Sequence, residues 1–124
     1  IMGSLVNGKL NGKWTYWYEN GQKSSEDTYK DGEFDGDWTS WYENGQKMVE
    51  GTFKDGKSDG LETWWYENGQ KKSEGTYKDG ELDGTQTQWN WNGQKEWERT
   101  YKDGEEIERT FWDEDGNVNY HWNQ

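Results

Sequence analysis

The sequence predicts an all-β protein: an open, curved and twisted single sheet, built as an antiparallel array of β-hairpin repeats with 24 residues and two strands in each repeat. Two observations lead to this prediction. Aromatic residues make up 18% of the 124 residues, whereas Ala, Pro and Cys are absent, so the Leu- and Ala-rich faces that pack helices together cannot form. Glycines recur every 24 residues, at positions 12, 36, 60 and 84 and again at 21, 45, 69 and 93, as in repeat arrays.

Charge and hydropathy limit the partners that this chain can have. The formal net charge of −12 argues against nucleic acid and against an anionic membrane surface, and it favours a basic protein or a neutral ligand. No apolar run approaches the length of a membrane span and no signal-peptide core is present, so we expect a soluble domain. The absence of Cys fits either a cytoplasmic or a secreted location.

Two blocks of sequence define each repeat. The first reads Trp-Tyr-Glu-Asn-Gly-Gln-Lys at 17–23, 41–47 and 65–71, and returns as Trp-Asn-Trp-Asn-Gly-Gln-Lys at 89–95. The second reads Thr-Tyr-Lys-Asp-Gly at 28–32, 76–80 and 100–104, with Phe in place of Tyr at 52–56. We expect residues 1–6 to be a cloning remnant with the N-terminal edge, residues 7–104 to form the repeats, and residues 105–124 to form a degenerate capping repeat.

Each repeat contains two turn signals, which place the strands between them. Asn-Gly is the strongest short hairpin signal because a type I′ turn needs positive φ at both central residues. We therefore expect two-residue turns at Asn20-Gly21, Asn44-Gly45 and Asn68-Gly69. The sequence Asp-Gly-x-x-Asp-Gly is expected to form a four-residue turn at the other end of the strands. The segments between the turns are rich in Trp, Tyr, Phe and Thr, which favour strands.

These turn lengths fix a register in which an aromatic ring covers a glycine on each neighbouring strand. Tyr29 should lie between Gly12 and Gly36, and the same pairing should recur in every repeat. The aromatic residues are Tyr29, Phe53, Tyr77 and Tyr101, and the glycines are Gly12, Gly36, Gly60 and Gly84. The same arithmetic places Lys54 between Asp35 and Asp59, as part of a row of alternating charges.

The register divides the side chains between two faces. One face should carry most of the apolar area, including Trp14, Trp38 and the four aromatic residues opposite the glycines. The other should be polar except for a file of tryptophans, which we expect either to contact a ligand or to stiffen the sheet by packing over Ser24, Met48 and Lys72. The file consists of Trp17, Trp41, Trp65 and Trp89. Threonines on this face alternate with Glu26, Glu50, Glu74 and Glu98.

These repeats resemble MORN repeats, and most closely the bacterial MORN variant with its Tyr-x-x-Asn-Gly-Gln and Tyr-x-Asp-Gly-x-x-Asp-Gly patterns. The resemblance extends from about Gly8 to Gly104. It implies a row of β-hairpins in a curved, twisted sheet, and it implies a role like that of antitoxin-like or immunity-like proteins. The chain departs from a lipid-binding role by its acidity.

Catalysis is not expected. The single histidine, His121, lies beyond the last well-formed repeat, and no Ser or Cys stands in a nucleophile context. Carboxylates recur in every repeat, whereas an active site is normally built once. Asp-Gly-x-x-Asp-Gly resembles a calcium loop, but ordinary turn chemistry accounts for it. We therefore expect no cofactor and no metal.

The sequence leaves three binding hypotheses open. The first is a protein partner, possibly basic, bound through an acidic, aromatic-rich face that includes the tryptophan file and the glutamate row. The second is a carbohydrate or choline-type ligand stacked on the tryptophans, which should repeat at roughly 9.5 Å. The third is a structural or engineered scaffold whose exposed edge strands pair with other copies of the chain.

Overall fold

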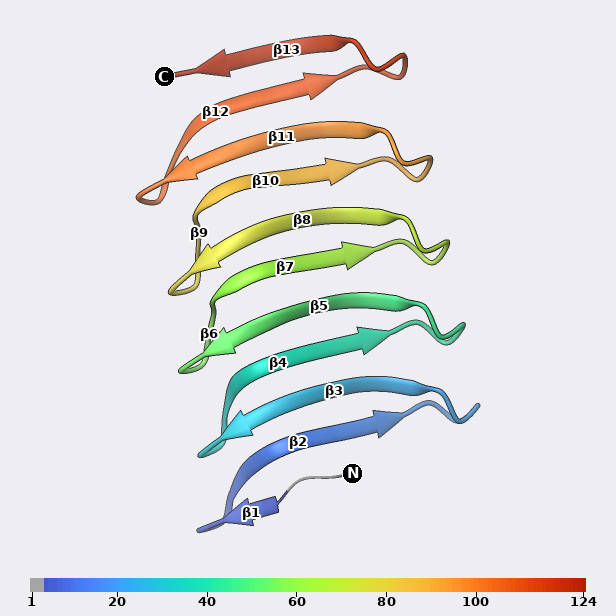
Figure 1. The fold of residues 1–124 in the computed structure, drawn as a ribbon, viewed down its shortest axis with the longest axis vertical. Helices are drawn as coiled ribbons and strands as arrows, with labels where there is room; N and C mark the ends of the chain where they lie inside the picture. Colours follow the sequence, from blue (N-terminus) through green and yellow to red (C-terminus); the bar gives the residue numbers. More distant parts are fainter. Residues whose placement is uncertain (1–3) are drawn as a thin grey trace.

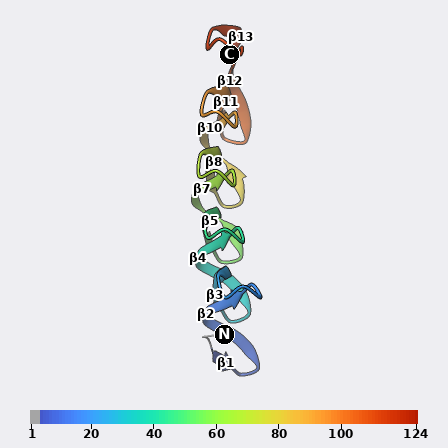
Figure 2. The same ribbon diagram turned by 90° about the vertical axis from the view of Figure 1, so that its right-hand side faces the viewer.

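The strands of this protein follow one another in a single antiparallel sheet, in the order in which they occur along the chain (Figure 1). The computed structural model describes residues 4–124. Turned by 90°, residues 4–124 form a sheet one layer thick, and no other part of this range covers either face (Figure 2). The strands bow along their length in Figure 1, and the predicted all-β hairpin array is confirmed. The described residues contain no helix long and apolar enough to cross a membrane.

Long strands alternate with tight turns over the whole described chain. The strands are β1 (Ser4–Val6), β2 (Lys9–Trp17), β3 (Lys23–Lys30), β4 (Glu33–Trp41), β5 (Lys47–Lys54), β6 (Lys57–Ser58), β7 (Gly60–Trp65), β8 (Lys71–Lys78), β9 (Glu81–Leu82), β10 (Gly84–Trp89), β11 (Lys95–Lys102), β12 (Glu105–Trp112) and β13 (Val118–Asn123). The short β6 and β9 pair with β5 and β8 beside the main path of the sheet. Residues 105–124 hold the last hairpin, β12–β13.

A single layer leaves almost no interior. Among the described residues, Val49 is the one buried hydrophobic side chain, and Thr15, Thr63 and Thr87 are the buried polar ones. Most aromatic side chains are half-buried against their neighbours on the same face. The fold is therefore held mainly by cross-strand contacts on the two faces and by the backbone ladder, because stacked layers that could enclose a core are missing from it.

The two-residue turn lies at the Asp-Gly pairs and not at the Asn-Gly pairs, where the sequence predicted it. Asp31 and Gly32 have φ of 51° and 84°, and Lys30 pairs directly with Glu33. The Asp-Gly pair is therefore a two-residue turn with positive φ at both positions, which is type I′ geometry. The same geometry recurs at Asp55, Asp79 and Asp103.

The Asn-Gly pairs form a three-residue loop instead, and the predicted type I′ turn there is wrong. Gly21 has a φ of 88° but Asn20 is not among the positive-φ residues. Gly21 N donates to Tyr18 O at 3.1 Å and Tyr18 N donates to Gln22 O at 2.8 Å. The Asn20 side-chain oxygen accepts from Gln22 N at 2.9 Å, which holds Asn20 in its place before the left-handed glycine. The loops at Asn44-Gly45 and Asn68-Gly69 have the same bonds.

The predicted glycine–aromatic pairing is confirmed on one side of each aromatic residue. The observed pairs are Gly12 with Tyr29, Gly36 with Phe53, Gly60 with Tyr77 and Gly84 with Tyr101. On its other side each aromatic residue faces a different partner, because the Asp-Gly turn is shorter than predicted. Those partners are Phe34, Ser58, Leu82 and Glu106.

The shorter turn also removes the predicted row of lysine and aspartate pairs. Lys54 lies opposite Lys57, not Asp59. Asp35 accepts a hydrogen bond from the backbone N of Asp55 at 3.1 Å, so this carboxylate holds the next turn. Asn11 has the same role toward Asp31 N, also at 3.1 Å.

Candidate functional site

A one-residue shift in register places a lysine, not the expected Ser24, beside the first tryptophan of the file. The ladder slips between Tyr16 and Trp17, so that Trp17 pairs with Lys23. The same shift pairs Trp41 with Lys47, Trp65 with Lys71 and Trp89 with Lys95. The predicted packing of the file over Ser24, Met48 and Lys72 is therefore wrong.

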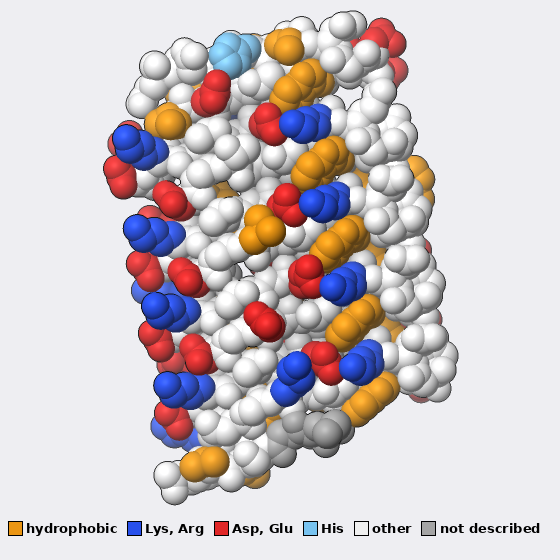
Figure 3. Space-filling model, in the orientation of Figure 1, with side chains coloured by type: hydrophobic (Ala, Val, Ile, Leu, Met, Phe, Trp, Pro, Cys, Tyr) orange, Lys and Arg blue, Asp and Glu red, His pale blue; other side chains and the backbone are white. Residues whose placement is uncertain are grey.

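Each of these lysines extends over the tryptophan of the following repeat. The Nζ of Lys23 lies 5.7 Å from the ring centroid of Trp41, and Lys47, Lys71 and Lys95 lie 5.8, 5.7 and 5.6 Å from Trp65, Trp89 and Trp112. These distances are those of cation–π contacts. Tryptophan and lysine thus alternate along one face, which we call the tryptophan–lysine face, and its regular series of apolar, basic and acidic side chains is visible in Figure 3.

The predicted glutamate row holds these lysines. The ion pairs are Lys23–Glu26, Lys47–Glu50, Lys71–Glu74 and Lys95–Glu98, at 2.7–3.0 Å. Thr15, Thr63 and Thr87 donate to Glu26, Glu74 and Glu98 at 3.1, 2.8 and 3.2 Å. The hydrogen bond from Lys23 is the largest cause that lowers the pKa of Glu26. The four carboxylates are therefore engaged within the sheet, and their contact with a partner stays a prediction.

Shallow recesses adjoin several tryptophans of this face. The recess between Trp17 and Trp41 has a volume of about 440 Å³ and is also lined by Lys23 and the loop glycines. Similar recesses adjoin Trp89 and Trp112. Trp17 is 48% exposed. Sequence reasoning missed Trp112, although it occupies the same place in the degenerate last repeat, just before the loop glycine Gly116.

The opposite face carries a continuous cluster of stacked rings, which we call the aromatic face. Tyr29 stacks on Phe34 and Phe34 on Phe53, with ring centroids 5.0 and 5.1 Å apart. Trp38 stacks on Phe53 at 5.6 Å and meets the edge of Trp64 at 6.5 Å. Phe34 and Trp64 are 38% and 36% exposed. Sequence reasoning missed Phe34 because its contact depends on the length of the Asp-Gly turn.

Trp38 occupies its place because a glycine lies beneath it. A Cβ built on Gly51 would lie 2.8 Å from the Trp38 Nε1, closer than real contacts allow. Gly51 is buried and its φ is that of an ordinary strand residue, so space and not backbone conformation requires glycine here. The Trp38 Nε1 is buried and has no hydrogen-bond partner among residues 4–124.

Tyrosines at the loop edge of the aromatic face fasten each repeat to the next. The hydroxyl of Tyr42 donates to the backbone O of Trp65 at 2.6 Å and that of Tyr66 to Trp89 O at 2.8 Å. Tyr18 donates to Trp41 O in the same way. These bonds fix the rings against the sheet. Burial, followed by the negative charge of Glu67, raises the pKa of Tyr42.

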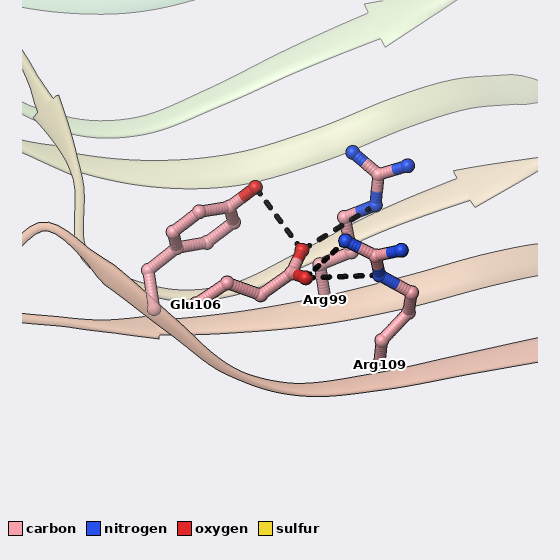
Figure 4. A network of polar contacts seen from close by, with 4 residues as sticks. Arg99, Glu106 and Arg109 are labelled. Carbon is pink, nitrogen blue, oxygen red and sulfur yellow. Dashed lines mark hydrogen bonds and ion pairs between the residues drawn. The ribbon is translucent and has the colours of Figure 1, made fainter. Parts of the chain in front are cut away.

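The C-terminal end of the aromatic face holds the two arginines of the chain. Arg99 and Arg109 both contact the carboxylate of Glu106 (Figure 4), with Arg109 Nε at 2.9 Å and Arg99 Nε at 3.6 Å. The Arg99 guanidinium also lies 4.5 Å from the ring centroid of Trp97. Glu106 thus offsets one of the two positive charges, and the network stabilises the last full repeat against the capping hairpin.

The described residues contain no group of His, Asp or Glu arranged to hold a metal ion. The imidazole of His121 shares a hydrogen bond with Thr110 Oγ1 at 2.9 Å and lies 3.9 Å from Glu108. His121 therefore has ordinary cross-strand neighbours in the last hairpin.

Comparison with known proteins places these repeats in a family. The family model described as MORN repeat variant matches residues 7–31, 34–55 and 58–79, which together exceed half of the chain. No curated protein matches the sequence.

Proposed function

This chain belongs to the MORN repeat variant family, and from that premise we propose that it is a non-enzymatic protein-binding module whose contact surface is the aromatic face. MORN repeats are generally binding or repeat modules. A protein partner is the kind of ligand that suits a broad sheet face of half-buried rings.

The observation that carries this proposal is the uncovered aromatic cluster. The rings of Phe34, Phe53, Trp38 and Trp64 contact one another in one surface, and within residues 4–124 no second layer covers it (Figure 2). Exposed apolar patches of this kind mark interaction sites in soluble proteins. Aromatic residues are also the residue types that dominate binding energy in protein interfaces.

Charge supports a basic partner, as in antitoxin-like or immunity-like proteins that block a basic effector. The net charge is −12, and complementary charge speeds association and selects the partner. On the tryptophan–lysine face the glutamates already have lysine partners. Glu19, Glu43 and Glu67 are exposed on the loops of successive repeats and have no ion-pair partner within residues 4–124, so they supply acidic charge to a partner's side chains.

Two neighbouring residues on opposite faces give a matched test. Trp64 lies on the aromatic face and Trp65 on the tryptophan–lysine face. Immobilised protein would be used to retain partners from an extract of the source cells, with Trp64→Ala and Trp65→Ala as paired variants and circular dichroism as the folding control. We expect a basic partner that high salt releases and that Trp64→Ala fails to retain, whereas Trp65→Ala retains it. Retention by both variants would contradict the proposal.

A carbohydrate ligand on the tryptophan–lysine face is the second candidate function. The recess between Trp17 and Trp41 favours it, and smaller recesses beside Trp89 and Trp112 offer further ring surface. A lysine over each following indole leaves less ring area for a sugar. Titration of tryptophan emission with soluble glycans tests it: a change that Trp41→Ala abolishes and salt leaves intact would support this candidate over a protein partner.

A further inference from the structure

One position on the aromatic face carries a different side chain in every repeat. The position follows the lysine that begins β3, β5, β8 and β11, and it is occupied by Ser24, Met48, Lys72 and Glu96. In the third repeat the Nζ of Lys72 lies 5.8 Å from the ring centroid of Tyr66. The chain therefore uses its own ammonium group to cover a loop-edge tyrosine at this position.

One repeat earlier, the same position holds Met48, and no cation of residues 4–124 lies over the ring of Tyr42. A recess of about 500 Å³ opens there, lined by Tyr18, Tyr42, Glu43, Asn44, Met48 and Glu67. We call it the Met48 recess. In this recess Tyr42 occupies the position that Tyr66 occupies beneath Lys72 one repeat later. The hydroxyls of Tyr18 and Tyr42 donate to backbone oxygens of the following repeat, so the two rings are held in place before any ligand binds.

The walls of the Met48 recess combine aromatic rings with negative charge. Glu43 and Glu67 are exposed, and neither carboxylate takes part in an ion pair within residues 4–124. The negative charge of Glu67 reaches the ring of Tyr42, where it adds to burial in raising the pKa of the phenol. Ring faces and carboxylates both attract a cation, and the thioether of Met48 offers an apolar surface for an alkyl chain.

We propose that the Met48 recess binds a lysine side chain of the protein partner, with its ammonium over Tyr42 where Lys72 covers Tyr66 and its alkyl chain on Met48. The chemistry of Lys72 in the third repeat is the reason for choosing lysine over other cations. The proposal rests on the proposed function, because it names the side chain that a basic partner would insert at the loop edge of the aromatic face.

The chain offers a direct probe of this recess. It contains two methionines, Met2 and Met48, so protein labelled with ¹³C at the methionine methyls gives two signals, which Met2→Leu assigns. The ligand probe is N-acetyl-lysine N-methylamide, and its control is the norleucine analogue, which has the same alkyl chain without the ammonium. We expect the lysine probe to shift the Met48 methyl signal saturably and the norleucine probe to leave it unmoved. Equal shifts, or no shift with either probe, would overturn the proposal.

Variants separate this recess from other sites on the sheet. Met48→Lys copies the arrangement of the third repeat, so it should fold and fill the recess with its own ammonium. Followed through ¹³C-labelled tyrosine rings, Met48→Lys should lose the response to the lysine probe, whereas Met48→Leu should keep it. Glu43→Gln combined with Glu67→Gln should weaken binding about threefold or more, because each exposed ion pair contributes modestly. A response that survives Met48→Lys would refute the assignment.

The outcome of this experiment is distinguishable from that of the proposed function. A partner that depends on Trp64 but is retained unchanged by Met48→Lys would leave the protein-binding function standing and reject the lysine recess. Loss of the partner from Met48→Lys alone, with retention by Met48→Leu, is the result that we expect.

Discussion

Replacement of Gly51 by alanine tests how the aromatic face is packed. The new Cβ would lie 2.8 Å from the Trp38 Nε1 and 3.4 Å from the Glu62 Cγ. The indole has to move away from the sheet, and its stacking on Phe53 at 5.6 Å and its edge contact with Trp64 at 6.5 Å are then disturbed. The backbone itself accepts alanine, because the φ of Gly51 is not positive.

The expected loss of stability follows from two opposing terms. Overpacking a close-packed site costs about 1–3 kcal/mol, whereas removing a glycine from a strand interior restores about 0.5–1 kcal/mol. The net destabilisation of Gly51→Ala is then about 0.5–2 kcal/mol. An unfolding entropy of about 2.1 cal/mol/K per residue converts this into a Tm lower by about 2–8 °C for a chain of this length.

Gly75 provides the matched control, since it occupies the same position one repeat later. A Cβ on Gly75 would meet the Gln86 Cγ at 3.2 Å and the Leu82 Cδ2 at 3.5 Å, and both side chains can yield. Gly75→Ala should therefore leave Tm unchanged or raise it by up to about 4 °C. Thermal unfolding followed by circular dichroism and tryptophan emission measures both variants, and equal changes in Tm would refute the packing argument. In a Trp38→Ala background, Gly51→Ala should no longer be destabilising.

Three further predictions concern a lysine of the tryptophan–lysine face, a half-buried carboxyl and a turn. Lys47→Met removes the cation over Trp65, and it should lower stability by about 0.5–1.5 kcal/mol in low salt and by less in 1 M salt, measured by urea unfolding. If the variant and the original protein were equally stable in low salt, the lysine–tryptophan contacts would not contribute to stability. Burial raises the pKa of the Asp27 carboxyl in the folded state. Below the ordinary carboxyl pKa this group does not weaken folding, but stability falls as the pH rises through the raised pKa, because the folded state then holds a poorly solvated charge. Asp27→Asn should therefore stabilise the protein at pH 7, and this gain should disappear in acid. Asp55 has a φ of 52°, so Asp55→Val should cost about 1–3 kcal/mol in chemical denaturation while Asp55→Asn costs little; similar losses would contradict the turn assignment.

The features of the fold that depend on repetition could be predicted from the sequence. The 24-residue spacing and the pairing of Gly12 with Tyr29 follow from glycine and aromatic positions that agree in each copy. An alternative register would have to pair glycines with aromatic residues equally well in every repeat. The match of four glycines to four aromatic residues is what identified the register.

The lengths of the turns could not be predicted, because Asn-Gly and Asp-Gly both favour a two-residue type I′ turn. The difference comes from the hydrogen bond that Asn20 accepts from Gln22 N and from those that Asn11 and Asp35 accept from the following turns. The last two cross from one repeat to the next. Local propensity does not contain such contacts.

The error in the predicted turn lengths changed the candidate site more than it changed the fold. One bulge after Tyr16 decides whether Lys23 or Ser24 stands beside Trp17. The tryptophan file was visible in the sequence, but its lysine neighbours and the pairing of Glu26 were not. The Met48 recess depends in addition on comparing positions that differ between repeats, and it becomes apparent only when Lys72 is seen over Tyr66.

The hydrogen bond from each loop-edge tyrosine to the repeat that follows has a consequence for how the gene can change. Because Tyr18, Tyr42 and Tyr66 each reach a carbonyl 23 residues further along, deleting or duplicating one whole unit of 24 residues rejoins a donor with an equivalent acceptor. Natural relatives of different length are therefore expected to differ by whole units, and an insertion of any other size would break the chain of tyrosines at one point.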